Sequence, residues 1–278
     1  MDLILSEFQR DLSVITRQLD LMDEIRKFSS TSELSEGYRS SISANEGKSS
    51  PSTALRKYLS EAHSLHMSAR NSHTGLPIAS GTMALYIAGR FEEYTRTSFE
   101  DLCQKLAQRA SSFKALPKKM QESLVVYTSM VMQAPRKFQH GEGAVAGFAA
   151  NLAANLSGES SVDQINYQCL SITEANMKPD TLADLYDRIG AKDIWKKISQ
   201  QAAVQAYFAT SDQSNAETLA KQKLTALMEL RNSIAHPSTS ITWPATESVR
   251  EYIGFLDVLA SSLSSLSGVF AATLCRVE

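Results

Sequence analysis

From Ser52 onward, the apolar residues of this chain recur at spacings of three and four, a period that restricts the fold to packed helices. The alternation that β-strands show is weak and confined to SITW, residues 240–243. The sequence therefore predicts an all-α domain. The expected helices cover about 52–69, 80–110, 117–133, 162–170, 179–188, 191–207, 214–236 and 245–273.

The first 54 residues have a different pattern, with one helix followed by a segment without apolar periodicity. Residues 3–28 predict one amphipathic helix, whose narrow apolar stripe suits a helix–helix seam. The stripe consists of Leu5, Phe8, Leu12, Ile15, Leu19 and Met22. Such a helix either docks onto the core of its own chain or pairs with a second subunit. Residues 29–54 are rich in serine and lack an apolar period, so we expect a linker or loop there. We accordingly divide the chain into an N-terminal extension, 1–54, and a helical domain, 55–278.

Composition limits the classes of partner. The formal net charge is −2, so any contact with RNA needs a local basic patch. Three basic pairs are candidates for such a patch, although each is more often a solvated surface. They are Lys118 with Lys119, Arg136 with Lys137, and Lys196 with Lys197.

The cysteines and the apolar runs bear on the compartment. Cys103, Cys169 and Cys275 are too few and too far apart for a disulfide framework or a zinc site. The N-terminus carries acids where a signal peptide needs a basic flank, and no stretch approaches the roughly 20 apolar residues of a membrane span. We expect a cytoplasmic protein that does not bind a membrane.

Two of the expected helices carry a charge on their apolar face. Glu92 lies on the face of Leu85, Ala88, Thr95, Phe99, Leu102 and Leu106. Arg231 lies on the face of Leu224, Leu227 and Ile234. A charge on a core face is costly unless it is paired and hydrogen-bonded. We therefore expect Glu92 and Arg231 to contact each other. The alternative is that one or both side chains extend to solvent at the edge of the face.

The helix that carries Arg231 ends in ELRNSIAHP. Pro237 disfavours helical geometry at His236, so the helix should end there. The three polar residues suit phosphoryl chemistry. Arg231 can hold anionic oxygens, Asn232 can orient the phosphate or the histidine, and His236 can move protons.

The spacing within this segment raises a geometric problem. Arg231 and His236 lie about 140° apart around an ideal helix, so either the helix end is distorted or two copies of the chain combine. An R-x4-H string is weak by itself, and a histidine that caps a helix end is its common alternative.

Three segments together resemble the HEPN superfamily. RNSIAHP resembles the R-x4-6-H motif in its RNxIAH form. ALYIAGRFEEYTRTSFEDL resembles the early helix in which a glutamate follows an aromatic residue, here Phe91 and Glu92. NMKPDTLADLYDRIGAKDIWKKI resembles the middle segment of the RiboL-PSP-like branch. The resemblance covers roughly residues 55 to 273.

This resemblance implies a HEPN-type helical bundle and a homodimer that brings two motifs into one cleft. It also implies endoribonuclease activity in toxin–antitoxin, anti-phage or RNA-processing systems. Arg231 and His236 then take the catalytic positions, with Asn232 beside the arginine and Glu92 as the helix acid. His236 would move protons during attack by the 2′-hydroxyl, while Arg231 would stabilise the phosphoryl charge.

No metal and no cofactor are expected, and the expected partners are RNA, a second copy of the chain, and a neutralising or sensor protein. Two alternatives stay open. One is a non-catalytic HEPN module that binds RNA, a nucleotide or a protein, and the other is a helical scaffold.

Further residues have an ordinary and a functional interpretation. His63, His66 and His73 lie near one another, but no carboxylate or cysteine supplies the remaining ligands of a metal site, so solvated histidines are favoured. Phe91 and Tyr94 flank the helix acid and can stack on a base. Packing in the core is the favoured interpretation of both rings.

Overall fold

The computed structural model describes residues 2–30, 53–72, 74–158, 164–236 and 241–275. In these ranges all regular structure is helical, which confirms the expected all-α fold. The α-helices are α1 (Leu3–Ser30), α3 (Thr53–Asn71), α4 (Leu76–Arg109), α5 (Lys118–Gln133), α6 (Ala144–Ser157), α7 (Tyr167–Leu170), α8 (Pro179–Asp187), α9 (Ile194–Ser199), α10 (Ala202–Tyr207), α11 (Gln213–Ala235) and α12 (Thr246–Thr273). The 3-10 helices η2 (Phe113–Ala115) and η3 (Pro135–Phe138) lie on either side of α5.

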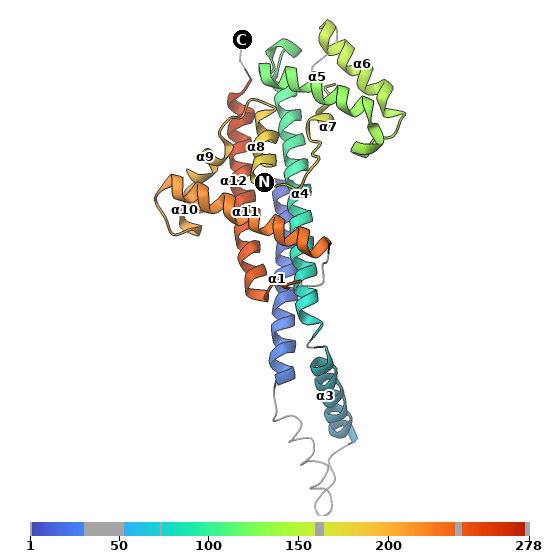
Figure 1. The fold of residues 1–278 in the computed structure, drawn as a ribbon, viewed down its shortest axis with the longest axis vertical. Helices are drawn as coiled ribbons and strands as arrows, with labels where there is room; N and C mark the ends of the chain where they lie inside the picture. Colours follow the sequence, from blue (N-terminus) through green and yellow to red (C-terminus); the bar gives the residue numbers. More distant parts are fainter. Residues whose placement is uncertain (1, 31–52, 73, 159–163, 237–240, 276–278) are drawn as a thin grey trace, which may run out of the picture.

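Helix α4 is the centre of the molecule. It packs against α12, α1 and α11. The helices α4, α12 and α1 run along the long axis, whereas α11 crosses them (Figure 1). The predicted apolar face of α4 is buried through most of its length, at Ala88, Thr95, Phe99, Leu102 and Leu106. The crossing of α11 over this helix places the end of α11 beside the middle of α4.

Helix α1 docks onto the core of its own chain, the first of the two arrangements that the sequence left open. Its buried stripe is Phe8, Leu12, Ile15, Leu19 and Met22. The Phe8 ring stacks on Tyr94 with 4.9 Å between centroids. Arg250 of α12 forms ion pairs of 2.8 Å with both Asp20 and Asp23. Apolar burial and flanking ion pairs thus hold the extension against α4 and α12.

Helix α12 differs from one expectation. It is long and apolar enough to cross a bilayer by length and composition, a property that the sequence analysis had not assigned to any segment. In the structure this helix packs along α4 and α1, and 44% of its most apolar window is buried. Its apolar side chains, such as Leu256 and Leu263, belong to the core.

The expected helix over 191–207 is divided into α9 and α10. Around one continuous helix, Val204 would lie about 120° from Ile198. The chain instead becomes extended at Gln201, where ψ is 129°. Because of this break, Trp195, Ile198 and Val204 are all buried in the same core.

The expected helix over 162–170 shortens to the single turn α7. Asn166, just before it, is held by other elements, because its side-chain amide donates to the Phe148 carbonyl at 2.8 Å. The small-residue segment that forms α6 was expected to allow close packing. Helix α6 contacts α5, but among its side chains only that of Asn155 is buried. The serine-rich segment beyond Ser30 lies outside the described residues until Thr53.

Trp243, which follows α11 in the sequence, packs against α4. A β-carbon on Gly81 would lie 2.3 Å from Cε3 of Trp243 and 3.5 Å from Cδ1 of Ile234. The indole therefore occupies the space that any side chain at position 81 would need. This contact ties the carboxyl end of α11 to α4 from the side of Ile234.

Gly81→Ala should lower the free energy of unfolding by about 1–3 kcal/mol, because the added methyl group overlaps the Trp243 ring. Helix propensity alone predicts the opposite sign, a gain of about 1 kcal/mol. Chemical denaturation followed by circular dichroism measures the change.

Gly89→Ala is the matched control on the same helix. No atom lies within 4 Å of a β-carbon at Gly89. This variant should gain about 0.5–1 kcal/mol. Equal shifts in both variants would contradict the close packing of Trp243.

Candidate active site

Three elements bring three of the four predicted site residues together. Glu92 projects from α4, and Arg231 and Asn232 lie in the last turn and a half of α11. The segment between α7 and α8 passes through the same place and contributes Asn176 and Met177. The site therefore forms where α11 crosses α4 and the α7–α8 segment lies against both.

The contact predicted between Glu92 and Arg231 is confirmed, as a long ion pair. Nη2 of Arg231 lies 4.0 Å from Oε2 of Glu92. The two side chains are 27% and 20% exposed, respectively. Each charge is thus largely withdrawn from solvent, yet the pair stays reachable from outside, as a site for a charged ligand requires.

The second oxygen of Glu92 has a backbone partner. The Met177 amide donates to Oε1 of Glu92 at 3.2 Å. One carboxylate therefore connects α4 to the α7–α8 segment through one oxygen and to α11 through the other. A carboxylate that accepts a backbone N–H is better satisfied in a partly buried position than one that faces a cation alone.

Asn176 belongs to the site although the sequence did not single it out. Its side-chain amide donates to Oδ1 of Asn232 in a short hydrogen bond. The same oxygen accepts from Nη1 of Arg231 at 3.3 Å. Only its hydrogen bond to Asn232, a residue distant in the sequence, distinguishes Asn176 from an ordinary loop asparagine. The one hint in the sequence was its place at the start of NMKPDTL, a segment already recognised as distinctive.

The guanidinium of Arg231 has unused hydrogen-bonding capacity. Within the described part of the chain, its Nε is buried and has no hydrogen-bond partner. Nη1 makes one bond of 3.3 Å, and Nη2 approaches Glu92 only to 4.0 Å. Arginine presents five N–H donors in a rigid fork that matches phosphate oxygens. The Nη groups of this partly exposed guanidinium therefore have donors that an anionic ligand can take up.

His236 stands at the end of α11 and is exposed. Its backbone N–H still donates to the Asn232 carbonyl at 3.0 Å. Its own dihedrals, φ −124° and ψ 72°, have left the helix. The ideal-helix angle of about 140° therefore does not describe where this imidazole points. Of the four predicted site residues, the structure connects Glu92, Arg231 and Asn232 to one another and leaves the His236 side chain outside that network.

The remaining candidates are structural or lie at the surface. His66 is buried, with Nδ1 3.0 Å from the Phe28 carbonyl, so its expected solvation was wrong. His73 lies outside the described residues, within which no cluster of potential metal ligands occurs. Phe91 and Tyr94 are buried in the core, as favoured, and the Tyr94 hydroxyl donates to the Ala260 carbonyl at 2.8 Å.

The basic pairs are mainly engaged with acids. Four of these side chains form ion pairs in the part that the structure describes. The pairs are Lys118 with Glu122, Lys119 with Asp187, Arg136 with Glu142, and Lys137 with Glu174. These four residues thus form ordinary solvated ion pairs, and Lys137 also borders a cleft.

The model of one protein family, RiboL-PSP-HEPN, matches residues 54–267. The match begins at the start of α3 and contains every residue of the site described above. It leaves out α1, the helix that packs against the outside of α4. No curated protein and no solved structure is significantly similar to the chain.

Glu92→Ala should lower the free energy of unfolding by about 1–3 kcal/mol, since it leaves the Met177 amide and the Arg231 guanidinium without their acceptor. Glu92→Gln keeps an oxygen that can accept the Met177 amide, so it should lose less stability. Urea denaturation measures both.

Glu93→Ala serves as the matched control, because the neighbouring Glu93 side chain is 52% exposed and contacts only nearby residues of its own helix, Arg96 and Thr97, among the interactions of the described residues. It should change the stability by no more than about 0.5 kcal/mol. A loss in Glu93→Ala as large as that in Glu92→Ala would contradict the central position of Glu92.

Proposed function

The chain belongs to the RiboL-PSP-HEPN family, a family of RNases, and on that premise we propose that it is a metal-independent endoribonuclease. The observation that carries the proposal is the state of Arg231. Its guanidinium is held at the crossing of α4 and α11, beside an amide and with donors to spare, five residues before an exposed imidazole. That combination suits an RNA phosphate.

The proposed reaction needs only these side chains. The 2′-hydroxyl loses its proton, its oxygen attacks the adjacent phosphorus, and the bond from phosphorus to the 5′-oxygen breaks. A proton then passes to that oxygen, so the products carry a 2′,3′-cyclic phosphate and a 5′-hydroxyl. His236 moves the proton, as imidazoles do near neutral pH. Arg231 and Asn232 hold the phosphoryl oxygens while negative charge accumulates on them.

The two catalytic side chains come from two copies of the chain in this proposal. Within one chain, the described residues hold Arg231 in the Glu92 network, whereas the His236 side chain lies outside it. A two-fold axis near the end of α11 would bring two such sets together, because such an interface uses the same patch of both subunits. The proposed biological role is the toxic effector of an anti-phage or toxin–antitoxin system, controlled by a neutralising or sensor partner.

His236→Ala should reduce the cleavage of total RNA, measured in EDTA, by about 10²–10⁴-fold, because the proton transfer loses its catalyst. Arg231→Lys should also be strongly impaired, since a point charge does not replace the fork of donors. Ser233→Ala changes an exposed residue of the same turn, whose hydroxyl donates to the Leu230 carbonyl, and should cleave like the parent. Wild-type protein that leaves every RNA intact would favour a binding module instead.

A mixture of two inactive variants tests the two-copy site. When Arg231→Ala and His236→Ala are mixed and allowed to exchange subunits, half of the dimers are mixed. In each mixed dimer, one composite site holds both native residues, so about a quarter of the wild-type activity should return. No recovery after verified exchange would show that both residues act within one chain.

A further inference from the structure

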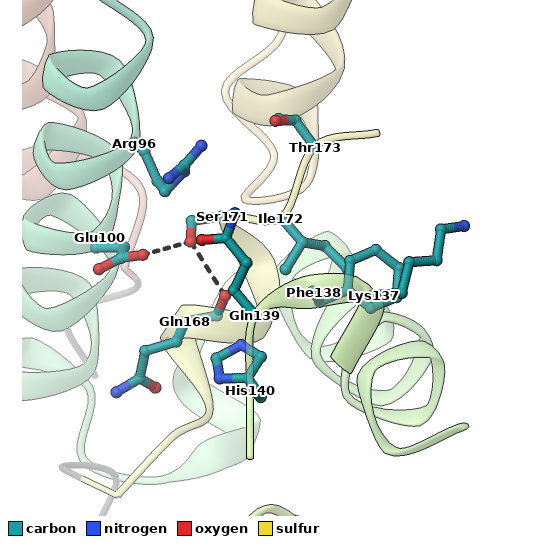
Figure 2. A pocket seen from close by; sticks show the side chains of 10 residues that line it. All are labelled: Arg96, Glu100, Lys137, Phe138, Gln139, His140, Gln168, Ser171, Ile172 and Thr173. Atoms are coloured by element: carbon teal, nitrogen blue, oxygen red, sulfur yellow. Dashed lines mark hydrogen bonds between the residues drawn. The ribbon is translucent and has the colours of Figure 1, made fainter. Parts of the chain in front are cut away.

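A cleft opens beside α4 on the side of the α7–α8 segment, beyond Glu92 in the direction of Arg109. Its volume is about 250 Å³. Polar side chains from three elements surround it (Figure 2). These are Arg96 and Glu100 of α4, Gln139 and His140 after η3, and Gln168 and Ser171 at α7.

Helix α4 connects this cleft to the Arg231 site. Glu92, Arg96 and Glu100 are spaced by four residues, so they follow one face of the helix over about 12 Å. The segment 171–177 lies along the same face and is attached at both ends. The Ser171 hydroxyl donates to the Glu100 carboxylate (Figure 2). At the other end, the Met177 amide donates to Glu92 at 3.2 Å. The cleft and the Arg231 site are thus two ends of one polar strip.

The contents of the cleft match the parts of a nucleotide. The Arg96 side chain is 39% exposed and forms one ion pair among the described residues, with Glu93 at 3.4 Å, so it can still bind a phosphate. Gln139 and Gln168 offer amides, which pair with the polar edges of bases. Phe138 adds an apolar wall. Lys137 points away from the Ser171 side of the cleft (Figure 2). It pairs with Glu174 at 2.6 Å.

The lining also contains an acid and restricts the size of the ligand. Burial raises the pKa of Glu100, although the hydrogen bond from Ser171 opposes that rise. The volume lies below the roughly 300–1,000 Å³ of typical small-molecule pockets. A single unpaired nucleotide therefore suits the cleft better than a folded or double-stranded ligand does.

We propose that this cleft binds one unpaired nucleotide of the RNA substrate, a few positions along the strand from the phosphate at Arg231. The proposal rests on the function proposed above. The distance along α4 corresponds to two to four nucleotides, at about 3.4 Å per nucleotide of a stacked strand. Arg96 binds the phosphate of that nucleotide, while Gln139 and Gln168 contact the edge of its base. Single-stranded RNA is commonly recognised through such splayed bases.

Fluorescence anisotropy with a labelled single-stranded RNA hexanucleotide tests the cleft, with His236→Ala as the parent so that no RNA is cut. Arg96→Gln and Gln168→Ala should each weaken binding about tenfold. Arg109→Gln removes the same charge from the exposed end of the same helix and should bind like the parent. Circular dichroism verifies that each variant is folded. A hexanucleotide with 4-thiouridine should crosslink to the peptide that contains Gln139 or Gln168.

The outcomes separate the two proposals. If all variants bind with equal affinity while the wild type still cleaves RNA, the proposed nucleotide site in the cleft is wrong and the proposed ribonuclease activity is unaffected. An equal loss in Arg96→Gln and Arg109→Gln would also overturn the cleft, since only general attraction would remain. Weaker binding in the two cleft variants alone, together with no cleavage of any RNA by the wild type, would support the cleft and refute the ribonuclease.

Discussion

A carboxylate at the crossing of two packed helices needs partners on both sides, and Glu92 obtains them from elements far apart in the sequence. One oxygen accepts the Met177 amide at 3.2 Å, and the other faces the Arg231 guanidinium at 4.0 Å. These contacts determine how far α11 and the α7–α8 segment stand from α4. Glu92 touches no reacting atom in the proposed chemistry. In that proposal it positions Arg231, which explains why an acid lies at the edge of the apolar face of α4.

The same pair leaves part of the Arg231 guanidinium available to a ligand. A bidentate bridge would have used most of the donors of Arg231 and satisfied the carboxylate fully. The structure instead has a long ion pair, one hydrogen bond to Asn232, and a buried Nε without a partner among the described residues. Partly buried ion pairs contribute little net stability. Because the hydrogen-bonding groups of this site are incompletely paired, an anion that enters can form the missing interactions. The arrangement thus serves ligand binding more than the stability of the fold.

Much of this arrangement could be predicted from the spacing of apolar residues along the sequence and from the charges that interrupt it. An acid and an arginine on two apolar faces were expected to meet, and the stripe from Phe8 to Met22 was expected to be buried. The features that the sequence did not predict depend on contacts between distant residues, which leave no pattern in the neighbouring sequence. Asn176 reaches Asn232 only because the α7–α8 segment lies against α11. The break at Gln201 arises because Ile198 and Val204 must both face one core. The surroundings of His66 depend on Phe28, which belongs to a different helix.

The shared use of α4 has a consequence for how a substrate would be handled. Glu92 and Glu100 hold opposite ends of the segment 171–177, so the Arg231 site and the cleft cannot move independently of that segment. A nucleotide bound beside Ser171 would therefore restrict the same backbone that positions Asn176 and, through it, Asn232. Binding energy gained away from the reacting phosphate can then be used to orient it, which raises the rate of the chemical step as well as the affinity. In such an arrangement, RNAs long enough to reach the cleft would be cut faster at saturation than shorter ones, even though the reacting groups are the same.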